Sequence, residues 1–538
     1  MSATTRLWKV VYDAYLEPFA RHVNASIGQK SVFAPLVKDA NTESILVTVV
    51  IGLIVVGVFL YTLKNIAYPK LKPNEPPMVS YWIPVLGSAA WLGIDPFGFY
   101  KKCQKEHGDY YQFLLLGKKM VTCLGAEGNN FVFNAKLADA SAEDAYKSLT
   151  VPVFGKGVVY DVQNSVLMEQ KRFVKAGLSN ERLQAYAPLI VKEAVDYFAR
   201  WNKPFGVENI YKASAELTIM TASRCLLGEE VRSKLDESFA QIFHDLDAGF
   251  SPINFVFEDL PIPSNRLRDK AHIKMRNFFL DIMESRRKSG TEDRTDIMSY
   301  LIKQCQYKDG RRPTDVEAAH MMIALLLAGQ HTSSTTSAWA FIFLAENPHL
   351  FEQLRKEQIN ILGSLDAPLT LENVKKLSLL DNVLRETLRI RPPITNMMRK
   401  ANRDIPIPNT NYVVPKGSYI QAVPVISQRA DQYFDNPEQF LPSRWDKYDK
   451  DVKVKDDDLV DYGWGAMHSS SAKSPYLPFG AGRHRCIGEA FAYLQIKTII
   501  ATFVRLFEIK LHKGKFPNSD YTTLIPQPIN PLVDYVRI

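Results

Sequence analysis

The sequence contains few cysteines, and their spacing does not pair them. Its 538 residues include five cysteines, with no Cys-x-x-Cys motif and no cysteine–histidine cluster. This pattern argues against a disulfide scaffold and a structural zinc site, and it favours a reducing compartment. The five are Cys103, Cys123, Cys225, Cys305 and Cys486.

The sequence also has no block of basic residues, and residues 78–538 contain no internal repeat and no low-complexity tract. Its 66 Lys and Arg residues exceed its 58 Asp and Glu residues, and the net charge of +8 is spread along the chain. This charge is too dilute to indicate nucleic acid and better suits a membrane surface or an acidic protein partner. Hydrophobic residues at 46% and charged residues at 23% argue against a disordered chain or a polytopic membrane protein.

One long hydrophobic run stands out. Residues 45–63 carry no charge, and as a helix they would be about 28 Å long, enough to span a bilayer core. A buried core helix fits less well because the run is so rich in Val and Ile. A cleaved signal peptide is also disfavoured, because the run begins only at residue 45. The run therefore predicts one transmembrane helix.

The flanks of this run suggest the domain organisation. In residues 1–44, aromatic residues recur at helical spacing beside basic ones, as in a helix lying on a membrane, although an ordinary packing helix would look similar. Residues 64–77 form a proline-rich connector. Residues 78–538 contain no comparable linker and are predicted to form one large domain. The aromatic residues are Trp8, Tyr12, Tyr15 and Phe19, and the prolines are Pro69, Pro73, Pro76 and Pro77.

The domain is predicted to be mainly α with small β-sheets. The clearest helix begins at Thr314, where a capping box with Glu317 is expected, and ends before Pro348. Its apolar stretch at 321–327 should be buried because nearly every side is hydrophobic. Short β-prone runs lie at 111–124, 412–425 and 521–538.

The densest cluster of chemically useful residues is FGAGRHRCIG at 479–488. A dinucleotide fingerprint is rejected, because Arg485 occupies the third glycine position and no strand-turn-helix context surrounds it. Glycines let the backbone approach a flat ligand, while cationic side chains and peptide N–H groups stabilise a thiolate. These properties suit an iron-ligating cysteine beneath a haem. A lone cysteine is more often a small core residue, so the surrounding pattern carries the assignment of Cys486.

This segment resembles the Phe-x-x-Gly-x-x-x-Cys-x-Gly signature of the cytochrome P-450 superfamily. Glu386 and Arg389 resemble its Glu-x-x-Arg helix, and Arg444 resembles the arginine that completes that ion cluster. Residues 328–332 fall where the family places its oxygen-binding motif. A solvated surface pair is the ordinary interpretation of an i, i+3 spacing, but the leucines flanking Glu386 indicate a packed helix. The three residues are therefore predicted to be scaffold.

The resemblance implies haem b as the cofactor, with Cys486 as the ligand of the haem iron. It also implies that Thr332 and His331 are catalytic, and that Thr332 relays protons to bound oxygen. A threonine that only bonds back to its own helix is an equally good interpretation without the family context. The residues expected to bind the haem propionates are Tyr146, Tyr160, Lys171, Arg399 and His484.

Three further segments are similar to the fungal sterol 14α-demethylases, namely residues 330–333, 154–161 and 249–255. Aromatic residues of this kind are usually core, but here they are expected to line an apolar cavity for a flat sterol. One departure is Thr395-Asn396, where the fungal enzymes usually carry His-Ser. The expected substrate-binding residues are Tyr146, Phe154, Phe250, Pro252, Phe255 and Gly329.

The resemblance implies an oxidoreductase of sterol biosynthesis. It would remove the 14α-methyl group of lanosterol or a close relative in three oxidations that use O2 and NADPH, on the route to ergosterol. No flavin or nicotinamide fold is visible, so a separate NADPH-dependent reductase is expected. The alternatives are another membrane monooxygenase, such as a fatty acid or sterol side-chain hydroxylase, and a haem-containing sterol carrier that performs no oxidation.

The expected location is the endoplasmic reticulum membrane, in contact with lipid. Within about 20 residues of the run, two lysines precede residues 45–63 and three follow them. Because the more basic flank of a membrane span tends to be cytosolic, this difference of one lysine favours a cytosolic catalytic domain. The lysines are Lys30 and Lys38 before the run, and Lys64, Lys70 and Lys72 after it.

Overall fold

The computed structural model describes residues 54, 56–57, 71–81, 83, 86–235, 237–251, 253–257, 260–290, 296–448, 472–521 and 524–538. The chain divides into two compact units, residues 1–70 and 71–538. The predicted tail and transmembrane helix lie almost wholly outside the described residues, as does much of the connector. Among the helices that are described, none combines the length and the apolar character needed to cross a bilayer.

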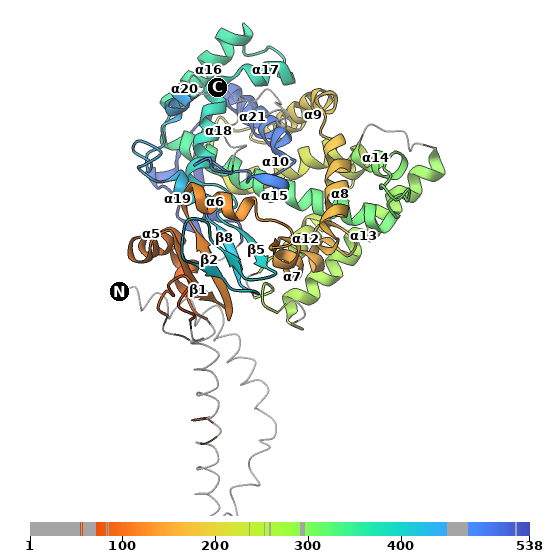
Figure 1. Cartoon of the computed structure of the whole chain (residues 1–538). Coiled ribbons are helices and arrows are strands. Elements are labelled where there is room, and N and C mark those ends of the chain that lie inside the picture. The colour runs from red at the N-terminus through yellow and green to blue at the C-terminus, as the bar shows by residue number, and fades with distance from the viewer. Residues whose placement is uncertain are drawn as a thin grey trace, which may run out of the picture. The chain divides into compact units, whose positions relative to one another are not determined.

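The second unit is mainly helical (Figure 1). Its helices are α4 (Ala89–Ile94), α5 (Pro96–His107), α6 (Gly125–Phe133), α7 (Glu143–Phe154), α8 (Asn164–Ala176), α9 (Asn180–Phe198), α10 (Ile210–Ala222), α11 (Glu229–Ser233), α12 (Glu237–Asp247), α13 (Pro263–Ser289), α14 (Ile297–Lys303), α15 (Asp315–Glu346), α16 (His349–Leu362), α17 (Leu371–Lys376), α18 (Ser378–Ile390), α19 (Pro424–Gln428), α20 (Trp445–Tyr448) and α21 (Glu489–Leu506). Single turns are η2 (Val159–Asp161), η3 (Ser223–Leu227), η4 (Pro442–Arg444), η6 (Gly482–His484) and η7 (His512–Gly514).

The strands are β1 (Tyr110–Leu115), β2 (Lys118–Cys123), β3 (Ala140–Ser141), β4 (Phe205–Asn209), β5 (Met397–Ala401), β6 (Ile405–Pro406), β7 (Val413–Val414), β8 (Tyr419–Ala422), β9 (Phe507–Leu511), β10 (Ser519–Asp520), β11 (Gln527–Pro528) and β12 (Leu532–Arg537). The largest sheet has the order β1-β2-β8-β5-β3, and a second has the order β4-β12-β9. The pair β2–β8 is parallel, so segments almost 300 residues apart become neighbours.

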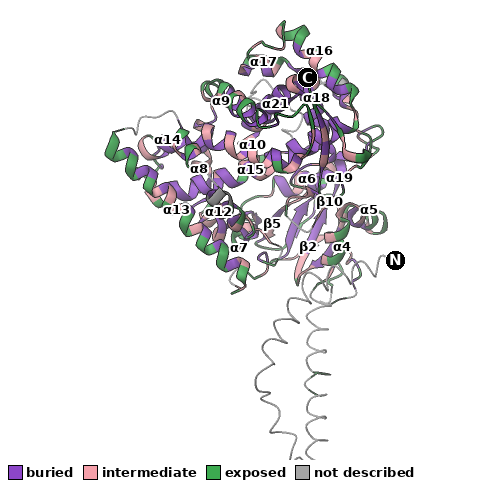
Figure 2. Ribbon diagram, turned by 180° about the vertical axis from the view of Figure 1, so that it is seen from behind, coloured by how far each residue is buried: buried purple, intermediate pink, exposed green. Residues whose placement is uncertain are grey.

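Helix α15 is the longest of the described helices, and most of its residues are buried. The predicted capping box is present: the Thr314 hydroxyl accepts the Glu317 backbone N–H at 3.1 Å, and the Glu317 carboxylate accepts the Thr314 N–H at 2.8 Å. The helix then runs for 32 residues among α10, α13, α18 and α21. Figure 2 shows that α15 is largely buried, whereas α13 has one buried and one exposed face.

The β-prone runs match strands in part. The first contains the hairpin β1–β2, and the last contains β11 and β12. The run at 412–425 holds β7 and β8 but ends in α19 instead of continuing as a strand. Strands β4, β5 and β9 gave no comparable sequence signal.

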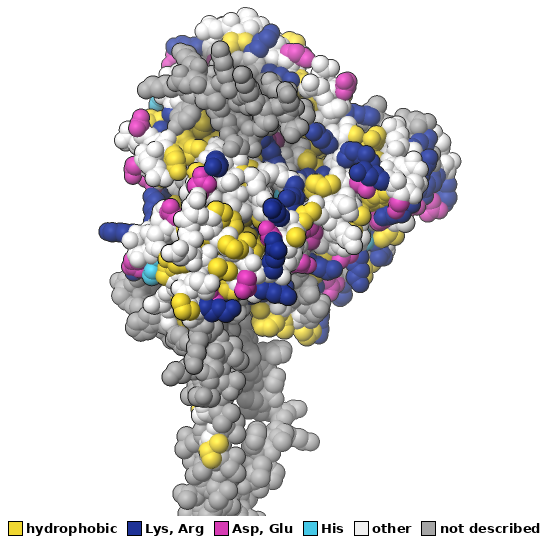
Figure 3. Space-filling model, viewed as in Figure 1, with side chains coloured by type: hydrophobic (Ala, Val, Ile, Leu, Met, Phe, Trp, Pro, Cys, Tyr) yellow, Lys and Arg dark blue, Asp and Glu magenta, His cyan; other side chains and the backbone are white. Residues whose placement is uncertain are grey.

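The described surface carries mixed charge. On the face shown in Figure 3, basic and acidic side chains lie interspersed, with hydrophobic side chains between them. This distribution agrees with the dilute net charge of the sequence.

Candidate functional site

Cys486 lies in a loop between η6 and the start of α21. Gly482 has φ +63°, and a Cβ atom there would lie 2.9 Å from the Phe133 carbonyl oxygen on α6, so only glycine fits this close approach. The Cys486 N–H donates to the Phe479 carbonyl at 3.0 Å. The loop is thus held from within and against α6.

Cys486 differs from the other cysteines in its exposure. The other four are buried and Cys486 is exposed, yet enough protein surrounds it that burial raises the pKa of its thiol. The Gly488 backbone N–H, Lys171 and Arg485 act in the opposite direction and lower that pKa. The loop therefore supplies partial stabilisation of a thiolate, the form that a bound metal cation favours strongly.

Cationic groups gather beside this cysteine. Lys171 on α8 donates through Nζ to the carbonyl oxygens of Arg483 and Arg485, at 2.9 and 3.0 Å. Burial, together with the positive charges of Arg399, Lys171 and Arg483, lowers the pKa of His484 to about 3. Mutual repulsion of this kind marks a site that favours anions.

Two tyrosines extend the cluster. The rings of Tyr146 on α7 and Tyr160 in η2 stack with centroids 5.2 Å apart, and Tyr160 lies 6.3 Å from the His484 ring. The Met398 N–H donates to the Tyr146 hydroxyl oxygen at 2.8 Å, which leaves that hydroxyl its own proton to donate. The structure thus brings together all six residues that the sequence assigned to cofactor binding.

One stripe of α15 is open. Ala328 is exposed, and Leu325, Gly329 and Thr332 are partly exposed; among the other residues of 321–336 only His331 is partly exposed, and the rest are buried. These positions share one helix face. A Cβ atom placed on Gly329 would meet no atom within 4 Å, so the stripe faces open space. The Thr332 hydroxyl bonds back to the Ala328 carbonyl at 2.8 Å, as the plainer interpretation of this threonine expected.

His331 faces a different neighbour. Its Nε2 lies 2.8 Å from a carboxylate oxygen of Asp247 on α12, and its ring stacks on Phe243 with centroids 5.7 Å apart. The part played by Asp247 cannot be predicted from the sequence, because nothing in the local sequence distinguishes this carboxylate from its neighbours.

The predicted substrate-binding aromatics fall into two groups. Phe154 and Phe250 form an edge-to-face pair with centroids 5.6 Å apart. Phe255 instead packs on Tyr419, at 5.3 Å, and is only 6% exposed. Pro252 lies outside the described residues.

A buried ion cluster joins α18 to the segment that contains η4 and Trp445. Arg389 binds both carboxylate oxygens of Glu386 at 2.8 and 2.9 Å, and Nε of Arg444 donates to one of them at 2.9 Å. Glu386 also accepts the Trp445 indole N–H at 3.1 Å. The side chains of Glu386 and Arg389 are both 0% exposed, so the structure confirms the buried pair and its predicted third partner.

Gln428 connects this scaffold to the cysteine loop. Its amide nitrogen donates to the Leu388 and Arg389 carbonyls at 3.2 and 3.0 Å, and its oxygen accepts the Leu477 N–H at 3.1 Å. Leu477 lies just before the glycine-rich segment. The role of Gln428 cannot be predicted from the sequence, because it depends on contacts between distant segments.

The sequence profile of the cytochrome P450 family matches residues 76–533. The chain belongs to this family. It is 46% identical over 490 residues to sterol 14-alpha demethylase CYP51A of Gibberella zeae, covering 89% of this chain and 96% of that protein. It is also 46% identical over 477 residues to lanosterol 14-alpha demethylase of Cunninghamella elegans, covering 88% of this chain and 93% of that protein.

A solved structure shows the same P450 fold. It is retinoic acid-bound cyanobacterial CYP120A1, with a TM-score of 0.71 and 21% identity, covering 87% of this chain and 100% of that one. The enzyme class follows from the family: this P450 is a haem-thiolate monooxygenase with haem as its cofactor.

The residues of this P450 fit that cofactor. Arg399 is 5% exposed and donates through Nη1 to the Met398 carbonyl at 2.7 Å, while its buried Nη2 has no partner among the described residues. Two propionate carboxylates would satisfy such a donor together with Lys171 and the tyrosine hydroxyls.

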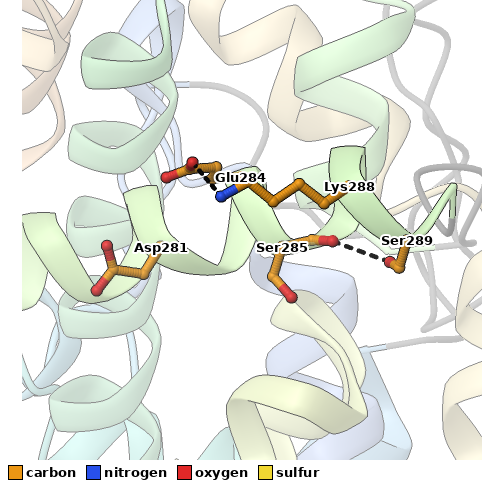
Figure 4. A pocket seen from close by; sticks show the side chains of 5 residues that line it. All are labelled: Asp281, Glu284, Ser285, Lys288 and Ser289. Atoms are coloured by element: carbon orange, nitrogen blue, oxygen red, sulfur yellow. Dashed lines mark hydrogen bonds and ion pairs between the residues drawn. The ribbon is translucent and has the colours of Figure 1, made fainter.

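A shallow hollow on α13 lies elsewhere (Figure 4). All five residues that line it belong to this one helix, and Lys288 pairs with Glu284 at 2.6 Å. The hollow contains none of the residues predicted to bind the haem or the substrate.

Proposed function

We propose that this P450 is a sterol 14-alpha demethylase that acts on lanosterol or a close relative. The observation that carries the proposal is the identity of 46% over nearly the whole length of two fungal proteins with that activity in their names. The open stripe of α15 and the aromatic pair Phe154–Phe250 both support an apolar substrate, because flat apolar ligands bind where few polar groups face the space.

In this proposal, Cys486 ligates the haem iron, and the propionates are bound by Tyr146, Tyr160, Lys171, Arg399 and His484. The support is the accessible sulfur beside a cluster of cations and hydroxyl groups. When bound, a thiolate-ligated haem supplies the oxygen-activating chemistry. The protein residues position the substrate, exclude water and deliver protons.

Thr332 and His331 are proposed to take part in proton transfer. Because Thr332 donates its own proton to the Ala328 carbonyl, its oxygen lone pairs can accept a hydrogen bond from the open side of α15. His331 contacts Asp247, whose side chain is 30% exposed, so this pair can exchange protons with solvent. These two contacts are the support for assigning the proton-transfer role to Thr332 and His331.

The proposed substrate wall comprises Tyr146, Phe154, Phe250 and Gly329. The space at Gly329 supports this assignment, because any larger residue would project into it. Phe255 belongs to the hydrophobic cluster against which Tyr146 packs. Phe255 and Pro252 are also predicted to contact the substrate.

Reconstitution tests the function. The purified enzyme, NADPH, a P450 reductase and lanosterol are expected to give the 14-demethylated sterol, identified by mass spectrometry. Fatty acid or sterol side-chain hydroxylation with the 14α-methyl group intact would favour the alternative monooxygenase. A haem-dependent spectral response to lanosterol without any oxidised product would favour a carrier.

Replacing Thr332 with alanine is expected to separate binding from turnover. Haem content and lanosterol affinity should be retained, product formation should fall at least tenfold, and hydrogen peroxide per NADPH consumed should rise, because a proton-transfer group contributes about 10²-fold or more. Thr336→Ala is the matched control, since Thr336 makes the same bond to the Thr332 carbonyl but is buried. An equal loss of lanosterol binding and turnover would assign Thr332 a structural role.

We also infer that residues 45–63 anchor the enzyme in the endoplasmic reticulum membrane, with residues 78–538 cytosolic. The uncharged run and the need to meet a cytosolic reductase support this topology. In intact microsomes, protease should digest a C-terminal tag and spare an N-terminal one. Digestion of the N-terminal tag with protection of the C-terminal tag would reverse the assignment.

A further inference from the structure

Two histidines hold the C-terminal end of α7. The carbonyls of the last helical turn have no partners within a helix. Here the Val153 carbonyl lies 3.0 Å from Nδ1 of His272 on α13, and the Lys156 carbonyl lies 2.8 Å from Nδ1 of His320 on α15. Because a carbonyl only accepts, each Nδ1 must carry the proton.

The turn after α7 is shaped to the His320 ring. Gly155 has φ +100°, and a Cβ atom there would lie 2.5 Å from three atoms of that ring. The backbone therefore lies against the imidazole, which no residue with a side chain would permit. The His272 and His320 rings are 5.0 Å apart, so α13 and α15 each contribute one of two neighbouring rings that contact this segment.

Both histidines act as fixed donors. Burial lowers the pKa of each ring, and the charge of Arg276 lowers both further. Nε2 of His320 is buried with no partner among the described residues, so a second proton there would have no acceptor. The pair is therefore suited to hold the backbone and not to exchange protons.

The held segment carries Phe154, one residue of the proposed substrate wall. Phe154 lies between the two anchored carbonyls and contacts Phe250. A Cβ atom on Gly249, next to Phe250, would lie 2.8 Å from a methyl carbon of Val153. The position of Val153 therefore affects both aromatic rings.

We propose that His272 and His320 are positioning residues that fix the end of α7 and so orient Phe154 and Phe250 toward the substrate. The substrate part of this inference rests on the proposed function. The anchoring part rests on the described contacts alone.

The test compares His320→Phe with His320→Asn in the full-length holoenzyme. Phenylalanine keeps a ring against Gly155 but has no donor, whereas the asparagine Nδ2 can donate to the Lys156 carbonyl. We expect the spectral dissociation constant for lanosterol to rise at least fivefold in the phenylalanine variant, the cost of about one buried hydrogen bond. In the phenylalanine variant, KM should rise by a similar factor while kcat changes less than twofold. In the asparagine variant, the spectral dissociation constant, KM and kcat should all remain within twofold of the values of the original enzyme.

Two further measurements distinguish a loss of anchoring from damage to the haem site and from an error in the proposed function. Binding of imidazole to the haem iron and the reduced carbon monoxide spectrum should be unchanged in both variants. Amide hydrogen exchange over residues 155–160 should be faster only in His320→Phe, and this readout needs no substrate. Lanosterol binding by the phenylalanine variant equal to the original, or exchange equal in all three proteins, would overturn the inference. Absence of any lanosterol response in the original enzyme would instead overturn the proposed function, and the exchange data would still decide the anchoring.

Discussion

Replacing Cys486 with alanine is expected to abolish monooxygenase activity completely and to remove the absorption typical of a thiolate-ligated haem in the reduced carbon monoxide complex. The effect should be this large because the family chemistry depends on a thiolate that favours O–O bond cleavage. Among the described cysteines, Cys486 alone is accessible and set in a cationic, glycine-rich loop. No neighbouring cysteine can substitute, because the other four are buried elsewhere.

The measurement is a carbon monoxide difference spectrum with haem quantified independently, followed by sterol turnover. Cys103→Ala is the matched control, since Cys103 is 1% exposed, lies within α5 and is not among the residues assigned to the haem or the substrate. It should retain both the spectrum and the activity. If Cys486→Ala kept the thiolate spectrum, another residue would have to be the ligand.

Replacing Glu386 with glutamine is expected to cost roughly 3 kcal/mol of stability, because breaking a buried ion cluster leaves charges without a counter-charge. Arg389 is fully buried, and its other partners are neutral carbonyl groups of residues 428, 437 and 439. Arg444 also loses its bond to the carboxylate. Haem retention should fall as well, since Gln428 links Arg389 to the segment that leads to the cysteine loop.

Urea unfolding followed by circular dichroism, with haem absorbance recorded in parallel, measures both effects. Glu284→Gln is the matched control. It removes the solvent-exposed pair with Lys288 on α13, seen in Figure 4, and should leave the urea midpoint unchanged because exposed pairs contribute little. Equal midpoints for Glu386→Gln and the original enzyme would show that the cluster does not stabilise the fold.

Several features of this protein were determined by the sequence itself. The capping box at Thr314 and Glu317 and the length of α15 follow from hydrogen bonds and apolar periodicity within a few turns of helix. The i, i+3 pair of Glu386 and Arg389 is equally local. The cysteine segment was recognisable because its glycines, cations and thiol are consecutive. The resemblance then supplied the more distant residues that are predicted to bind haem, and the structure places them near one another.

Other features were decided only by the tertiary structure. The parallel pairing of β2 with β8, the contact of His331 with Asp247, and the anchoring of α7 by His272 and His320 join residues that are far apart in the sequence. Local propensity cannot specify which distant carbonyl or carboxylate a side chain will meet. Such partners are selected when whole elements pack, because each buried polar group must then find a hydrogen-bond partner among the surfaces brought against it.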